Sequence, residues 1–127
     1  MGAFRLLYDD MKLLGSNLLP APLLALGVAL TACYPKAGPA PQALSADSAA
    51  RASTRIAGAT PQSLAAGHEL FIANCSRCHS YPDLASISEK EWPGIAASMS
   101  KKAGIAAPGN DQLLQFILAA RSEQGAP

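Results

Sequence analysis

The stretch that decides the fold is GHELFIANCSRCH, residues 67–79. Gly67 and Phe71 lie four residues apart, so they fall on one face of a helix together with other apolar side chains. Thr60 can cap that helix, and the proline after it suits the first helical position because its missing N–H would have been unpaired there anyway. The pattern predicts a helix over residues 61–74 that leads directly into the cysteines of the stretch.

Two further helices are predicted after this one. Ser88 and Glu91 have the spacing of a capping box at the start of the first, and Gly104 marks its end. The last helix begins near residues 110–111 and carries an apolar run until the polar residues 121–124. No stretch alternates apolar and polar side chains as a strand would. We expect a small all-α domain of about three to four helices.

The start of the chain reads as a targeting segment. Its apolar run over residues 18–30 is too short and too rich in proline to span a membrane, and it ends in the tetrapeptide LTAC at 30–33. That tetrapeptide resembles the bacterial lipobox, whose cysteine is acylated and becomes the new N-terminus. The resemblance implies a cleaved signal peptide over residues 1–32 and lipidation of Cys33. Met11 fits the start better than Met1, because a lysine follows it.

The composition of residues 33–59 differs from that of the rest. Ala, Pro and Ser dominate, and large aliphatic or aromatic side chains are almost absent, so little apolar surface can be buried. We expect a flexible linker over 33–59, with a short helix allowed within 42–56, and a folded domain over 60–127. The net charge of +1, with dispersed Lys and Arg, excludes a basic surface for nucleic acid.

Cys75, Cys78 and His79 form a C-x-x-C-H motif. Residues three apart on a helical turn share a face, so both thiols can bind one haem c while the next imidazole turns to its iron. A redox dithiol is one alternative, but that chemistry normally sits on a βαβ scaffold. Zinc is another, and its fourth ligand could only be His68. Two haem thioethers and one lipid thioether would use all three cysteines of the chain.

This motif, with Gly67 and Phe71 before it, matches the opening of monohaem class I cytochromes c, which the second half of the chain resembles. In that family the first and last helices of the domain cross near the glycine. The resemblance therefore implies that Phe71 meets Phe116. The segment 91–105 is similar to a subgroup in which a methionine after a tryptophan helix is the sixth iron ligand, which implies Met99 here.

A count of the side chains that could donate to the iron also points to Met99. After removal of the residues before Cys33, Met99 is the only methionine, and His68 is the only histidine besides His79. The sixth ligand is then Met99, His68, a lysine such as Lys101, or nothing. We favour Met99, because methionine with histidine is the usual electron-transfer pair of cytochromes c. His68 is expected to be solvated.

The expected function is single-electron transfer, without catalytic residues and without enzyme activity. The partners would be periplasmic redox proteins: a dehydrogenase, a quinol-oxidising complex, an oxidase or another cytochrome. Three alternatives stay open: a haem-based gas or redox sensor, the electron-accepting subunit of a periplasmic dehydrogenase, and a lipoprotein that uses haem for assembly alone. Tyr34 after Cys33 resembles the sorting pattern of outer-membrane lipoproteins, which implies a lipid anchor on the periplasmic side of that membrane.

Overall fold

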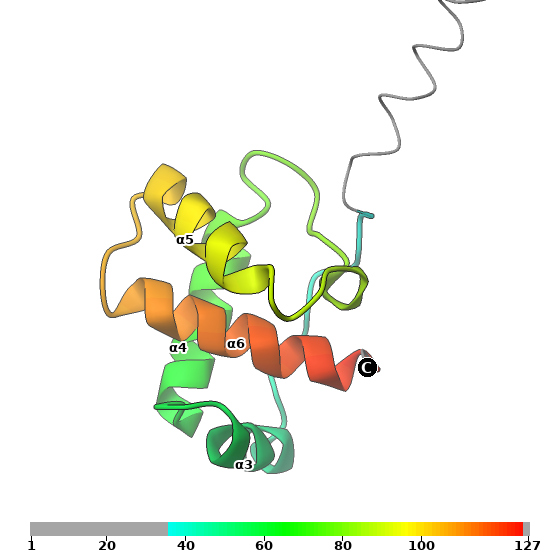
Figure 1. The fold of residues 1–127 in the computed structure, drawn as a ribbon, viewed down its shortest axis with the longest axis vertical. Helices are drawn as coiled ribbons and strands as arrows, with labels where there is room; N and C mark the ends of the chain where they lie inside the picture. Colours follow the sequence, from blue (N-terminus) through cyan, green and yellow to red (C-terminus); the bar gives the residue numbers. More distant parts are fainter. Residues whose placement is uncertain (1–35, 126–127) are drawn as a thin grey trace, which may run out of the picture. The chain divides into compact units, whose positions relative to one another are not determined.

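The computed structural model describes residues 36–125, and the regular secondary structure of these residues is helical. The elements are α3 (Ala46–Arg55), α4 (Pro61–Asn74), the 3-10 turn η1 (Leu84–Ser86), α5 (Trp92–Ala103) and α6 (Gly109–Glu123) (Figure 1). In this part of the chain the only β pairing is an isolated bridge between Ala37 and Pro82. The all-α prediction is confirmed.

Some predictions concern the chain before residue 36. The signal peptide over 1–32, the start at Met11 and the lipidated Cys33 all lie outside the described residues. Within residues 36–125, none of the helices has both the length and the apolar character needed to cross a membrane.

Helix α4 has the bounds that the sequence predicts. The Thr60 Oγ1 accepts a hydrogen bond from the Ser63 N–H at 3.0 Å, and the Ser63 Oγ accepts one from the Thr60 N–H at 2.9 Å. Two N–H groups at the start of the helix are thus paired by side chains, with the proline at its first position. The helix ends at Asn74, so the cysteine motif starts where its last turn ends.

Helix α5 starts later than its predicted cap. Both the Oγ and the N–H of Ser88 donate to the Glu91 carboxylate, at 2.6 and 3.2 Å, and these bonds lower the pKa of Glu91. They close a turn ahead of the helix, which itself begins at Trp92. Gly104 ends the helix as predicted, in the left-handed region with φ 71° that glycine adopts without strain.

Helices α4 and α6 cross at Gly67. A Cβ atom at this position would overlap the backbone carbonyl of Gln112 and would lie 2.7 Å from the Phe116 Cβ. The rings of Phe71 and Phe116 meet edge to face, with their centroids 5.8 Å apart. Both features are those that the family resemblance implies. They fix the direction in which α4 leads into the motif.

The residue Gly67 therefore permits no side chain. Gly67→Ala should destabilise the fold by about 2–3 kcal/mol, because the methyl group must push two helix backbones apart. Gly94→Ala is the matched control: it has no heavy atom within 4 Å of its added Cβ and should be neutral or slightly stabilising. Chemical denaturation of both variants checks this. Equal midpoints for the two would contradict the close crossing.

Helix α3 corrects the prediction of a flexible linker. It lies inside the predicted 42–56 window, but it is packed: Ala49, Ala52 and Ala59 form a buried cluster with Leu64 and Ala119. The prediction was wrong for residues 36–59, and the folded unit begins well before residue 60. Because alanine methyl groups are small, α3 can approach α4 and α6 closely enough to exclude water.

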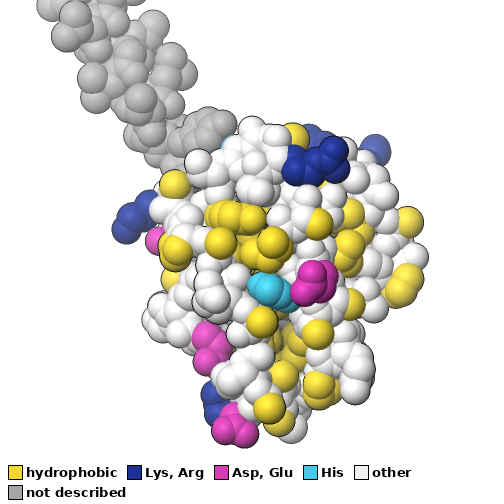
Figure 2. Space-filling model, turned by 180° about the vertical axis from the view of Figure 1, so that it is seen from behind, with side chains coloured by type: hydrophobic (Ala, Val, Ile, Leu, Met, Phe, Trp, Pro, Cys, Tyr) yellow, Lys and Arg dark blue, Asp and Glu magenta, His cyan; other side chains and the backbone are white. Residues whose placement is uncertain are grey.

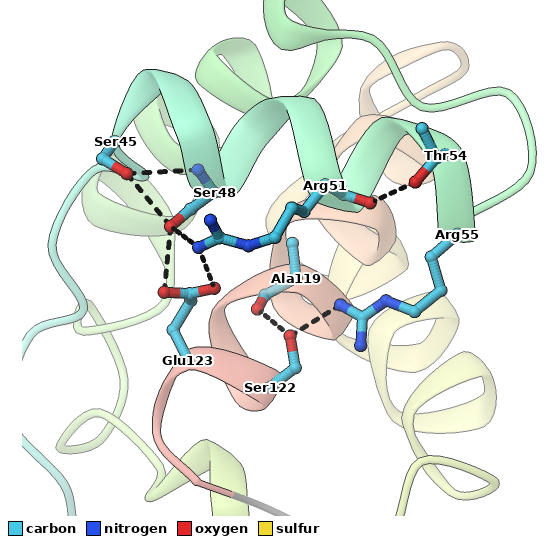
Figure 3. A network of polar contacts seen from close by, with 8 residues as sticks. All are labelled: Ser45, Ser48, Arg51, Thr54, Arg55, Ala119, Ser122 and Glu123. Atoms are coloured by element: carbon cyan, nitrogen blue, oxygen red, sulfur yellow. Dashed lines mark hydrogen bonds and ion pairs between the residues drawn. The ribbon is translucent and has the colours of Figure 1, made fainter.

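Polar contacts join α3 to the end of α6 (Figure 3). The Ser48 Oγ donates to the Glu123 carboxylate at 2.9 Å, and Arg51 donates to the same Oγ at 2.9 Å while lying 3.6 Å from Glu123. One turn further along, Arg55 donates to the Ser122 Oγ at 2.7 Å. These partners are separated by most of the folded part of the chain, so they tie its first helix to its last.

Candidate functional site

The C-x-x-C-H motif continues from the last turn of α4. Cys75 is the C-cap residue, and its N–H donates to the Phe71 carbonyl at 2.9 Å. The Arg77 N–H donates to the Asn74 carbonyl at 3.2 Å, which keeps the chain coiled into the motif. Because the chain stays coiled through these residues, two cysteines three apart can face the same way.

The two thiols differ in environment. Cys78 is exposed, whereas Cys75 is half-buried and packs against the main hydrophobic cluster, which includes Trp92 and Ala96 of α5. Burial raises the pKa of the Cys75 thiol to about 11, because the apolar surroundings disfavour the thiolate. Cys75 and helix α5 therefore share one apolar core.

This placement argues against a redox dithiol. Catalytic dithiols lower a cysteine pKa, often at a helix N-terminus, where the helix dipole stabilises the thiolate. Here Cys75 lies at a helix C-terminus, its pKa is raised, and the described residues form no βαβ unit. Both local effects keep the thiol protonated.

His79 is exposed and its ring is oriented by one hydrogen bond. The Nδ1 atom lies 2.7 Å from the Ser80 carbonyl oxygen, which can only accept, so Nδ1 carries the proton. The Nε2 atom is then the basic nitrogen, which suits a metal ligand whose other ring nitrogen bonds to a backbone carbonyl.

Met99 lies on α5 and is half-buried. Its neighbours Ala96 and Ser100 face the core, and both are almost fully buried. The Ser100 Oγ and the Asn110 Oδ1 are buried side-chain atoms without a hydrogen-bond partner among the described residues. The role of Met99 as an iron ligand stays a prediction.

The prediction that His68 is solvated was wrong. Its side chain is only 17% exposed, its Nε2 lies 3.2 Å from the Pro41 carbonyl, and its ring meets Phe116 edge to face. The hydrogen bond and the ring contact hold His68 against protein groups. A role for His68 as the sixth ligand would require both to break.

Sequence reasoning missed the segment that His68 holds, residues 36–45, which we call the strap. The Gly38 N–H donates to the Tyr81 carbonyl at 2.8 Å, and the Asp83 N–H donates to the Lys36 carbonyl at 2.7 Å. The one sequence signal for this pairing was the glycine at position 38. The structure shows why a glycine stands there, since a Cβ would lie 2.8 Å from the Asp83 Cα. The strap thus pairs with the loop over residues 81–90, which begins two residues after His79.

The donor set of the motif fits haem better than zinc. Within residues 36–125, no three His, Cys, Asp or Glu side chains gather as a metal-binding group. A haem c uses two cysteine thiols for covalent attachment and one imidazole as an iron ligand. One further donor can then serve as the sixth ligand. Cys75, Cys78 and His79 supply the two thiols and the imidazole. Of the three, Cys75 packs in one hydrophobic cluster with Tyr81 and Ile95.

The motif is presented at the surface and not inside an enclosed cavity. One cavity of about 350 Å³ lies elsewhere, between the strap and the end of α6, and is lined by residues such as Pro39, Ser45 and Glu123. Hydrophobic side chains also gather across the middle of one face of the molecule (Figure 2).

No family model, no curated protein and no solved structure matches the chain. The resemblance to class I cytochromes c thus depends on residues of this sequence. Two structural features agree with what that resemblance implies: the helix crossing at Gly67 and the contact of Phe71 with Phe116.

The different environments of the two thiols predict different reactivity. In residues 34–127 produced without haem, iodoacetamide at pH 8 should alkylate Cys78 at least about tenfold faster than Cys75. A pKa near 11 lowers the thiolate fraction of Cys75 about 100-fold, and the greater nucleophilicity of the thiolate only partly offsets this. Peptide mass spectrometry follows both sites. The Cys75 rate should keep rising toward pH 11, and equal rates at pH 8 would contradict the burial of Cys75.

Proposed function

We propose that this chain is a membrane-anchored monohaem c-type cytochrome that carries single electrons. The observation that supports this most is the C-x-x-C-H motif at the C-terminal end of a helix that crosses the last helix at Gly67. A helix C-terminus disfavours thiolates, and a solvated imidazole with a free Nε2 follows it. Thioether attachment uses the cysteines without requiring a stable thiolate in the folded protein.

Each residue of the site has a separate task. Cys75 and Cys78 would hold the haem through two thioethers, and His79 would bind the iron through Nε2, with its ring oriented by the Ser80 carbonyl. Met99 is the sixth ligand in this proposal. The haem supplies a one-electron Fe(III)/Fe(II) couple, and ligation by a thioether favours the reduced state relative to a second imidazole.

The proposal includes an anchor and a compartment. Acylation of Cys33 would hold the protein on the periplasmic side of a bacterial membrane, with the outer membrane favoured by Tyr34. The partners are periplasmic redox proteins, such as a dehydrogenase, a quinol-oxidising complex, an oxidase or another cytochrome. Because His79 and Met99 would both bind the iron in this proposal, no coordination site would be left for a substrate.

The visible spectrum tests the electron-carrier proposal. Residues 34–127 are co-expressed with the haem-attachment machinery as wild type and as Met99→Ala. We expect a low-spin ferric wild type with a weak sulfur-to-iron charge-transfer band. This band should vanish in Met99→Ala, because alanine cannot supply the thioether.

His68→Ala is the matched control for this experiment. It removes the other candidate imidazole and should leave the band unchanged, because His68 bonds to Pro41 and contacts Phe116. A high-spin wild type that binds carbon monoxide rapidly and is indifferent to Met99→Ala would contradict the electron carrier. That result would favour a gas sensor.

A further inference from the structure

The strap leaves little free chain between the proposed anchor and the folded head. The first described residue, Lys36, already accepts a hydrogen bond from Asp83, and Gly38 bonds to Tyr81. The bridge between Ala37 and Pro82 lies between these two bonds. Gly38 lies so close to Asp83 that only glycine fits. The strap is therefore bound to the loop from its first described residue onward.

Chain length then limits how far the head can stand from the lipid. Two residues, Tyr34 and Pro35, lie between Cys33 and Lys36, so the three Cα–Cα steps from Cys33 to Lys36 span at most about 10 Å when fully extended. A flexible linker over residues 33–59 would instead reach about 90 Å. The strap thus shortens the reach of the anchor about ninefold.

We infer that the lipid surface of the anchoring membrane contacts the face formed by the start of the strap and the loop over residues 81–90. This inference depends on the proposed acylation of Cys33. The loop begins two residues after His79, so the haem-binding motif is held close to the bilayer. Helix α3 lies at the opposite end of the described fold from the start of the strap (Figure 1).

The charges of this face indicate that the tether, and not electrostatics, causes the contact. Lys36 and Lys90 are exposed, and so is Glu89, while Asp83 is half-buried. Two cations and two carboxylates leave no basic patch for anionic lipids. The head without its acyl chains should therefore not bind vesicles.

This geometry also restricts the redox partner. A head within about 10 Å of its lipid anchor cannot reach a redox centre high in the periplasm. Electron exchange then requires a partner whose own redox centre lies near the same membrane surface, such as an integral membrane complex or a second anchored protein.

Amide hydrogen exchange on vesicles tests the contact. The acylated, haem-loaded chain is compared with a variant carrying a Gly/Ser insertion of about 20 residues after Pro35, which adds a root-mean-square span of about 25 Å. Peptides from residues 36–40 and 81–90 should exchange several-fold more slowly in the wild type than in the insertion variant. Peptides from α3 should exchange equally in both.

A point substitution gives an independent test. Gly38→Ala should move the strap away from the loop and shift the exchange of residues 81–90 toward that of the insertion variant. Gly94→Ala should behave like the wild type, because its added methyl group meets nothing. Peptides from α4 and α6 report whether the Gly38→Ala head stays folded.

Two results would overturn the inference, and they are distinguishable. Equal exchange of residues 81–90 in an acylated wild type and the insertion variant overturns the membrane contact alone. An intact mass without acyl groups at Cys33 overturns the contact together with the anchor. Haem loading, measured on the same samples by absorbance, tests the electron-carrier proposal separately.

Discussion

The close crossing of α4 and α6 at Gly67 is the constraint on which the rest of the fold depends. The absence of one side chain lets the two backbones meet, so that Phe71 and Phe116 pack edge to face. This contact joins the cysteine motif, which follows α4, to the last helix of the chain. Helix α5 completes the same core through Trp92 and Ala96. A crossing at which two helix backbones approach so closely is sensitive to single methyl groups, because protein cores are close-packed.

The strap links the proposed anchor at Cys33 to this core. Residues 36–45 would be a tether by composition, but their backbone pairs with the loop after His79 and their Pro41 carbonyl meets His68. If Cys33 is acylated as proposed, only a short stretch of chain would separate the anchor from the C-x-x-C-H motif and the core. In the proposed function, an electron carrier tethered in this way would exchange electrons along the membrane plane, with partners close to the lipid.

The sequence predicted the elements whose signals are local. The cap at Thr60, the stop at Gly104 and the apolar face of α4 all depend on residues close together in the chain, and the structure confirms them. The packing of α3 and the burial of His68 could not be predicted in this way. Alanines give a weak apolar pattern, and the partners of these groups, such as Ala119 and Pro41, are distant in sequence.

In the candidate site, too, some features follow from local sequence and others only from the structure. Cys75, Cys78 and His79 are recognisable from their spacing alone, and the structure adds the Ser80 carbonyl as the group that orients the imidazole. Met99 comes from a resemblance and from a count of donors, so its ligation requires direct measurement. The raised pKa of Cys75 depends on tertiary burial, which no local pattern contains.

Intact mass under denaturing conditions tests the central claim, covalent attachment of haem to this motif, most directly. The chain is co-expressed with the haem-attachment machinery as wild type, as Cys75→Ala/Cys78→Ala, and with Cys33→Ser as the matched control. Attachment at the motif predicts one added haem in the wild type and in Cys33→Ser, and none in the double variant. A wild-type chain that reaches the periplasm with two free thiols or a disulfide at Cys75 and Cys78 would contradict it.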